Sequence, residues 1–205
     1  MNGTAESIPL KIPFAIVDVL SNHQMREAIL LALLQKEKTG KGAQLKISML
    51  KTAVSALINQ ASNYLMNANI PEKKGSAHPS IAPYGDTFLT KDQQYIVLAV
   101  GTDKQFTTLC KLLNIPQIAQ DVQFSTNPNR VLNRSKLIKN LREKIINENA
   151  EELMDHFLEN QVPAGLIKNM KQVFDHPITQ SMIKEEVIEG ITTRRVSTVG
   201  FEIGS

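Results

Sequence analysis

The sequence predicts an α/β protein in two parts, a helical part followed by a smaller mixed domain. Apolar residues recur at helical spacing through residues 18–68. The stretch PEKKGSAHPSIAPYGD at 71–86, rich in proline and glycine, then interrupts regular patterning. Beyond it, short alternating segments and amphipathic segments follow one another, which is typical of a small α/β domain. We therefore expect a helical part at 1–72, an α/β domain at 73–175 and a closing segment at 176–205.

The first helix is expected from about Asp18 to Lys38, with a stop at Gly40. Its middle, AILLALL at 28–34, is apolar on every side and so needs packing partners all around it. The chain offers few strands before this segment to cover it. We therefore expect a piece of a larger protein, or a chain that assembles obligately.

The second helix is expected from about Ile47 to Ala68, with Pro71 marking its end. An apolar stripe at helical spacing supports this helix and is expected to pack into a core. Its members are Ile47, Leu50, Val54, Leu57, Ile58, Ala61 and Leu65.

Mixed structure is expected beyond the break. DTFLT at 86–90 and QYIVLAV at 94–100 flank the polar turn KDQ and predict a hairpin. Thr102 and Gln105 have the spacing of a capping box, which opens a short helix reaching Leu113. Further expected elements are helices at about 129–146 and 150–159, an extended segment VPAGLI, and two strands in IKEEVIEG and RRVSTVGFEI.

Composition narrows the classes of protein. With 205 residues and 42% hydrophobic content, a real core is possible. The net charge of +3 is small and spread out, which gives no electrostatic case for nucleic acid. The longest apolar run, 28–34, is too short to cross a membrane, and the N-terminus lacks the order of a signal peptide. We expect a cytoplasmic protein.

The histidine and cysteine residues are not spaced as the ligands of a metal site would be. His23, His156 and His176 show no ligand spacing and are expected at the surface. A single cysteine, Cys110, cannot form an internal disulfide, which fits a reducing compartment. Its apolar helical neighbours predict a buried, inert thiol.

One carboxylate interrupts the apolar run FAIVDVL at 14–20. Burying an unpaired charge costs several kcal/mol, so Asp18 needs an explanation. Asp18 is a favoured type of residue for capping the following helix. Alternatively, the helix begins at Ser21, whose spacing to Gln24 fits a capping box. The residues alone favour these structural interpretations.

Six stretches, in order, resemble those of one enzyme family. They are PLKIPFAIVDVL, EKTGKG followed by LKISML, GSAHPSIAPY, VGTDKQFTTLCKLL, NRVLNRSKL and VPAGLIKNMKQVFDHP. On these stretches the chain resembles the family III CoA-transferases, which include formyl-CoA, carnitine and succinate-type transferases. The resemblance extends over nearly the whole chain.

The resemblance implies a role for Asp18. In this family the matching acid is the nucleophile, which attacks the acyl-CoA donor and forms a mixed anhydride with release of CoA. CoA returns as an aspartyl-CoA thioester, and the acceptor carboxylate then displaces it. Covalent catalysis divides a difficult exchange into easier steps, and a helix N-terminus favours the ionised acid. Coenzyme A enters as the acyl-CoA substrate, and no metal is needed.

The resemblance also implies a binding role for four other residues. Gly75, Ala77 and His78 belong to the loop that lies over the reacting thioester in the family. His78 would donate to an acyl carboxylate or oxyanion, although it equally fits a residue that organises a proline-rich loop. Met49 stands where the family places a residue against the pantetheine arm, and an ordinary core methionine is the alternative.

The resemblance implies a partial fold. Family members are roughly twice as long and begin with a Rossmann-like half that binds the CoA nucleotide. We expect residues 1–72 to be the helical part of the large domain and 176–205 to return to it. The implied partners are acyl-CoA, a small carboxylic acid, a second copy in a homodimer and a separate chain carrying the nucleotide-binding half.

Two other functions remain open at this stage. The chain could be a non-catalytic fragment from a split or decayed gene. It could also be a 2-methylacyl-CoA racemase of the same superfamily, but that subgroup has a Gly-Asp-Phe-Gly-Gly-Gly stretch at the aspartate, and FAIVDVLSNH lacks it. The sequence names neither the donor acid nor the acceptor acid.

Overall fold

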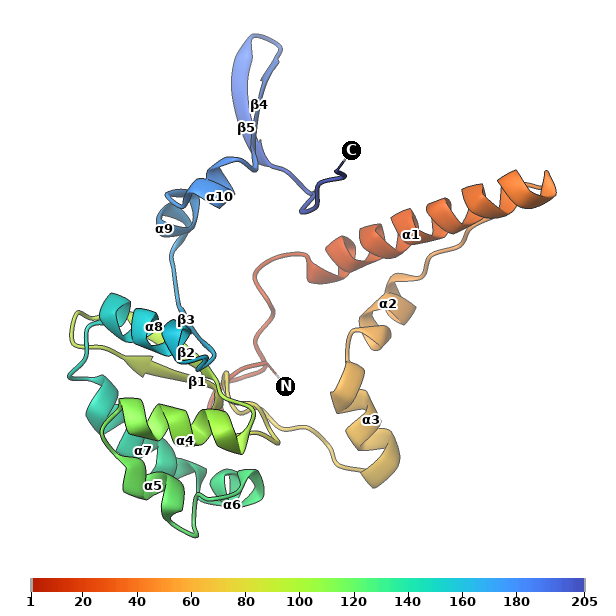
Figure 1. The fold of residues 1–205 in the computed structure, drawn as a ribbon. Helices are drawn as coiled ribbons and strands as arrows, with labels where there is room; N and C mark the ends of the chain where they lie inside the picture. Colours follow the sequence, from red (N-terminus) through yellow and green to blue (C-terminus); the bar gives the residue numbers. More distant parts are fainter. Residues whose placement is uncertain (1, 205) are drawn as a thin grey trace.

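The computed structural model describes residues 2–204. The hairpin expected around the KDQ turn lies within the α/β unit, at the lower left of Figure 1. Strand β1 (Tyr84–Leu89) pairs antiparallel with β2 (Tyr95–Ala99), and β2 pairs antiparallel with β3 (Ala164–Leu166). The spatial order is therefore β1-β2-β3. Residues alternate between buried and partly exposed positions along β1 and β2, because successive side chains point to opposite faces.

Short helices pack against this sheet and complete one α/β unit. They are α4 (Asp103–Leu112), α5 (Pro116–Gln120), α6 (Asn127–Leu132), α7 (Arg134–Ile145) and α8 (Ala150–Glu159). The sheet contributes Phe88, Ile96 and Leu98 to the core, and each is almost fully buried. The helices contribute Phe106, Leu109, Leu137, Leu141, Ile145, Leu153 and Phe157.

A local sequence signal explains where α4 begins, whereas a tertiary contact caps α8. The capping box of α4 is confirmed, because the Thr102 hydroxyl accepts from the Gln105 N–H and the Gln105 side chain accepts from the Thr102 N–H. Helix α8 begins at Ala150, but the Asn149 side chain makes no capping bond. Instead the Ala150 N–H donates to Asp92 in the hairpin turn over 3.1 Å. A tertiary contact therefore supplies this cap.

Two of the expected long helices are each divided. The helix expected at 129–146 is α6 followed by α7, with Asn133 between them. The helix expected at 47–68 is α2 (Met49–Ser55) followed by α3 (Ile58–Asn67). Ile58 has a φ of 44°, which a continuous right-handed helix does not permit. The sequence prediction was wrong here because apolar periodicity continues through the break.

Helix α1 (Ile16–Thr39) is confirmed and ends where Gly40 adopts the left-handed conformation, φ 68°. Ala15 occupies the N-cap position without a capping side chain, so neither Asp18 nor Ser21 caps this helix. The buried Ser21 hydroxyl has no hydrogen-bond partner among the described residues. The Gln24 side chain bonds to α2 instead, since it accepts from the Thr52 hydroxyl over 2.8 Å.

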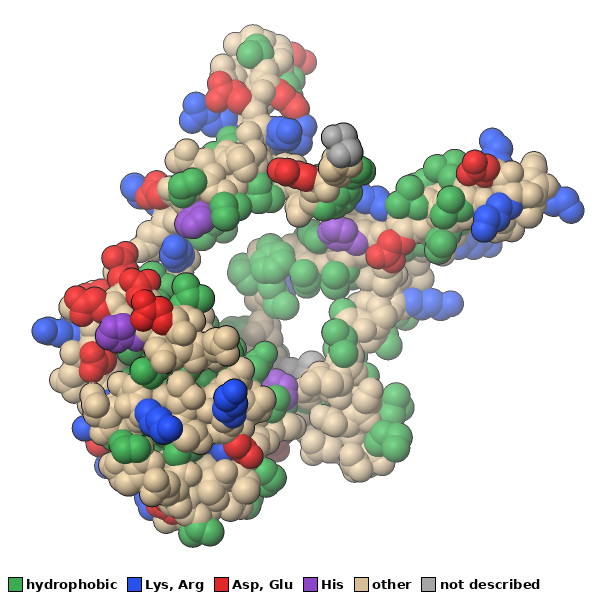
Figure 2. Space-filling model, viewed as in Figure 1, with side chains coloured by type: hydrophobic (Ala, Val, Ile, Leu, Met, Phe, Trp, Pro, Cys, Tyr) green, Lys and Arg blue, Asp and Glu red, His purple; other side chains and the backbone are tan. Residues whose placement is uncertain are grey.

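Helices α1–α3 form an arm that leaves the α/β unit, and its apolar side chains lie at the surface (Figures 1 and 2). No residue of α1 is buried, and Leu30 and Leu31 are 62% and 67% exposed. The expected burial of the second apolar stripe is also wrong for this chain, since Leu57 is 41% and Leu65 78% exposed. The residues follow helical spacing, but no packing surface faces them.

A second arm follows β3. It contains α9 (Met170–Phe174), α10 (Pro177–Gln180) and the hairpin of β4 (Ile183–Ile188) with β5 (Ile191–Val196). The two tail strands are thus confirmed, although β5 begins earlier than expected. Almost every residue of this hairpin is exposed. Like the first arm, the second arm contains secondary structure that no other part of the described chain covers.

Candidate active site

Asp18 lies in the first turn of α1, three positions after the N-cap residue Ala15. Its side chain is exposed, and no hydrogen bond or ion pair within residues 2–204 involves its carboxylate. The free N–H groups and the dipole of a helix N-terminus favour a negative charge here. The geometry therefore presents an accessible carboxylate in the first turn of a helix.

The second part of the candidate site is the loop 75–84, which leads into β1. Its backbone is folded back on itself, since the His78 N–H donates to the Tyr84 carbonyl over 2.8 Å. The Ala77 N–H donates to the Lys74 carbonyl, and the Gly75 N–H donates to the carbonyl of Gly3 over 2.9 Å. The His78 ring lies edge-on to the Tyr84 ring, with 5.4 Å between centroids. Such an ordered loop can hold His78 in one orientation.

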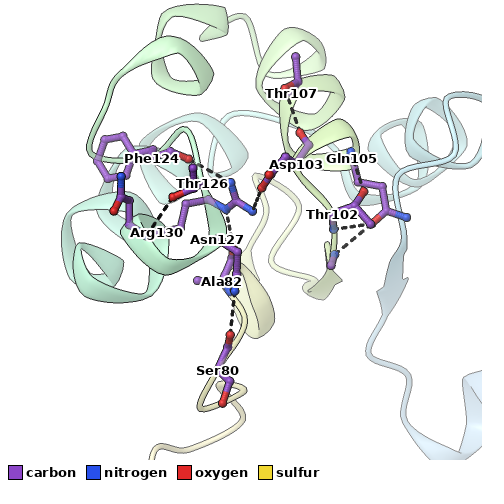
Figure 3. A network of polar contacts seen from close by, with 12 residues as sticks. Ser80, Ala82, Thr102, Asp103, Gln105, Thr107, Phe124, Thr126, Asn127 and Arg130 are labelled. Atoms are coloured by element: carbon purple, nitrogen blue, oxygen red, sulfur yellow. Dashed lines mark hydrogen bonds and ion pairs between the residues drawn. The ribbon is translucent and has the colours of Figure 1, made fainter.

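Three side chains from α6 and α7 hold this loop by its backbone. The Asn127 amide donates to the Ser80 carbonyl over 2.9 Å and accepts from the Ala82 N–H over 3.1 Å (Figure 3). Arg130 Nε donates to the Ala82 carbonyl over 2.8 Å. These contacts join the loop to the core of the α/β unit.

Arg130 is fully buried, so its charge needs several partners. Its other nitrogens donate to the Phe124 carbonyl over 3.0 Å and to the Asp103 carboxylate over 2.6 Å (Figure 3). The guanidinium also stacks on the Phe106 ring, 4.5 Å from its centroid. All the contacts together compensate for the lost hydration of the cation.

Arg134 makes the third connection and reaches His78 itself. It donates 2.6 Å to the His78 carbonyl and 3.1 Å to the Tyr84 carbonyl. Its guanidinium also forms a two-pronged pair with Asp86, at 2.7 and 3.1 Å. Both side chains are largely buried, 18% and 9% exposed, so this pair has a fixed geometry.

A glycine permits the close turn at the end of the loop. Gly85 has a φ of 79°, and a Cβ there would lie 2.0 Å from the Ser76 carbonyl oxygen. Any other residue would push the loop and β1 apart. The sequence contains this constraint in the letters PYGD, but only the approach of Ser76 reveals its reason.

The structure brings some of the expected site residues together and leaves others apart. Gly75, Ala77 and His78 share one loop, whereas Asp18 and Met49 lie on two contacting helices, α1 and α2. Met49 is the first residue of α2 and is half exposed. Within residues 2–204, no hydrogen bond or ion pair links Asp18 or Met49 to the loop. The two groups thus make no polar contact with each other among the described residues.

The sequence analysis missed the residues that hold the loop. Asn127 and Arg130 are three positions apart, which places them on one side of α6, and Arg134 is the first residue of α7. Arg130 is followed by apolar residues, and a cation in such a setting is a signal for a buried, paired group. That signal was available in the stretch NRVLNRSKL.

The remaining candidates have simpler roles. Cys110 is fully buried as expected, and burial raises the pKa of its thiol to about 12, although the charge on Arg130 acts in the opposite direction. Such a thiol is a poor nucleophile. Residues 2–204 contain no cluster of three or more metal-binding side chains. In the same range, no helix has the length and apolar character needed to cross a bilayer.

The model of the family described as CoA-transferase family III matches residues 1–201. The chain belongs to this family. It is 37% identical over 177 residues to the human succinyl-CoA:glutarate CoA-transferase, covering 86% of this chain. It is 32% identical over 181 residues to the succinate–glutarate CoA-transferase of Agrobacterium fabrum, covering 88% of this chain.

Solved structures agree with this assignment. A CAIB/BAIF family protein from Brucella suis matches with a TM-score of 0.72 and 33% identity over 98% of this chain. The Rv3272 protein of Mycobacterium tuberculosis matches with a TM-score of 0.82 and 27% identity over 99% of it. This family III chain spans only 40% of the human relative and 52% of the Brucella structure. The α/β fold class is thus confirmed, as part of a longer family fold.

Proposed function

We propose that this family III chain carries the nucleophile and the active-site loop of a CoA-transferase. The observation that supports it most strongly is the family match over residues 1–201, which includes both Asp18 and the loop 75–84. The proposed reaction moves CoA from an acyl-CoA donor to a carboxylic acid acceptor. Coenzyme A is the cofactor, in the form of the donor thioester.

Relatives named for succinyl-CoA and glutarate support a choice of substrates. We propose succinyl-CoA as donor and glutarate as acceptor. Asp18 attacks the thioester carbonyl, the C–S bond breaks, and CoA thiolate leaves from a mixed anhydride. The thiolate attacks the aspartyl carbonyl, which releases succinate. Glutarate then attacks the aspartyl-CoA thioester, whose C–S bond breaks, so that CoA thiolate leaves and an aspartyl–glutaryl anhydride forms. The thiolate attacks the glutaryl carbonyl of this anhydride, which forms glutaryl-CoA and frees the Asp18 carboxylate.

Exposed apolar surface supports the proposal that this chain works with additional protein. The arm α1–α3 carries Asp18 and Met49, yet its apolar residues are uncovered. We propose that a nucleotide-binding half, on a separate chain or joined to this one, covers that arm and completes the site. Gly75, Ala77 and Met49 would then line the path of the pantetheine arm. A homodimer of the completed unit is part of the same proposal, as is a cytoplasmic location.

The test supplies the proposed nucleotide-binding half. The part of the Agrobacterium fabrum enzyme that this chain does not match is coexpressed with the chain or fused to it, and CoA exchange from succinyl-CoA to glutarate is measured. We expect exchange that Asp18→Asn abolishes, because an amide cannot form the anhydride. Glu27→Gln removes another exposed acid from α1 and is the matched control, with exchange unchanged.

The covalent step has its own readout. Hydroxylamine added during turnover should leave an adduct on the peptide containing IVDVL, detected by mass spectrometry. An adduct on another residue, or full exchange by Asp18→Asn, would contradict the role of Asp18. A completed protein without any exchange would instead favour the alternative, a non-catalytic fragment. A racemase would epimerise a 2-methylacyl-CoA without needing a carboxylic acid acceptor. Epimerisation measured without glutarate therefore distinguishes a racemase from a CoA-transferase.

A further inference from the structure

His78 is the one histidine of the candidate site, and the chemistry of its ring depends on which nitrogen carries the proton. A neutral imidazole has one N–H donor and one acceptor nitrogen. The Ser80 backbone N–H lies 3.1 Å from His78 Nδ1 and points toward it. A backbone N–H can only donate, so Nδ1 must be the acceptor. The proton of the neutral ring is therefore on Nε2.

The backbone of His78 is fixed as firmly as its ring. Its carbonyl accepts from Arg134, and its N–H donates to the Tyr84 carbonyl. Arg134 in turn is held by the two-pronged pair with Asp86. The Tyr84 ring, edge-on at 5.4 Å, limits rotation of the imidazole. Among residues 2–204, no hydrogen bond involves His78 Nε2. Its N–H is therefore free to donate to a bound substrate.

We propose that His78 acts as a neutral Nε2–H donor toward an anionic oxygen of the acyl group, and that Arg134 is the residue that positions it. The assignment of the acyl group as the acceptor rests on the proposed CoA-transferase function. The tautomer and the role of Arg134 rest on the contacts of the loop alone. A donor held in place before the reaction stabilises developing negative charge without reorganisation.

The tautomer can be measured on the chain itself, without substrate. Long-range ¹H–¹⁵N NMR spectra of histidine-labelled protein, recorded where the imidazoles are neutral, separate Nδ1–H from Nε2–H rings. His78→Gln assigns the resonance, and the exposed His23 and His156 report the behaviour of unconstrained rings in the same sample. We expect His78 to be Nε2–H with a Nδ1–H fraction at least threefold lower than theirs. A mixture equal to theirs would overturn the proposal.

The role of Arg134 is tested with a matched pair on α7. Arg134→Gln removes the donors to the His78 and Tyr84 carbonyls and should raise the Nδ1–H fraction of His78 at least threefold. Lys139→Gln removes an exposed cation from the same helix and should change nothing. Arg134→Lys keeps the positive charge but loses the two-pronged guanidinium contact, and should give a Nδ1–H fraction between those of the wild type and Arg134→Gln. It serves as the test variant if Arg134→Gln does not fold. An unchanged tautomer in both Arg134 variants would contradict its positioning role.

A last comparison addresses the donor in catalysis. In the completed protein, His78→Gln places an amide N–H near the position of Nε2, whereas His78→Asn places it near Nδ1. We expect exchange to fall by up to about a hundredfold in His78→Ala and His78→Asn, and clearly less in His78→Gln. Equal loss in all three would exclude the donor role. If the completed wild-type protein shows no exchange, the proposed function fails, and the NMR result still decides the tautomer.

Discussion

At the scale of single residues, buried cations organise the α/β unit. Arg130 has no exposed side-chain surface and donates to two backbone carbonyls, of Ala82 and Phe124. Its acidic partner, Asp103, is 60% exposed and can be hydrated when the pair is broken. The backbone contacts therefore matter more for stability than the ion pair, because a surface-exposed partner contributes little.

We predict that Arg130→Met lowers the free energy of unfolding by roughly 3 kcal/mol, because two buried carbonyls lose their donors. Asp103→Asn should cost about 1 kcal/mol or less. Arg142→Met, an exposed position on α7, is the control and should stay within about 0.5 kcal/mol of the wild type. Urea unfolding followed by circular dichroism measures all three. Equal effects of the Arg130 and Asp103 variants would contradict this order.

At the scale of elements, two local signals located helix ends correctly, whereas the capping signals at Asp18 and Ser21 did not. The capping box of α4 and the glycine stop of α1 lie where the sequence placed them. Both depend on residues within one turn of each other, so the local sequence contains them. Periodicity failed at Ile58 and at Asn133, because it continues across a change of helix direction.

We predict that Thr102→Ala destabilises the α/β unit by about 1 kcal/mol through loss of the N-cap acceptor. Thr102→Ser keeps the hydroxyl and should restore most of that stability. Thermal unfolding monitored by circular dichroism compares the two. If Thr102→Ser and Thr102→Ala destabilised the protein equally, the lost packing of the threonine methyl group would explain the effect, and the lost capping bond would not.

At the scale of the whole molecule, the chain exposes more surface than a compact protein of its size. Its accessible surface is 14981 Å². A compact monomer of 22.8 kDa exposes roughly 9,600 Å². The difference comes from the two arms, where α1, α3 and the β4–β5 hairpin have no buried residues. Apolar area left in water favours association with a covering surface.

We predict that the chain expressed alone binds a hydrophobic dye and self-associates. Residues 73–175, which include the whole buried apolar core, should fold separately, melt cooperatively and bind much less dye. Light scattering and dye fluorescence of the two proteins at equal concentration make the comparison. A full chain that stays monomeric without dye binding would argue against a missing partner surface.

The sequence by itself determined the fold class, the hairpin, the capping box and the family, because each is written in neighbouring residues or in ordered stretches. Only the tertiary structure decided what holds the loop 75–84. Asn127, Arg130 and Arg134 are more than forty positions away from the backbone groups they bind in that loop. The tertiary structure also showed that AILLALL and the apolar stripe through Leu57 are uncovered. Apolar periodicity defines one face of a helix, but burial needs a second surface that packs against it.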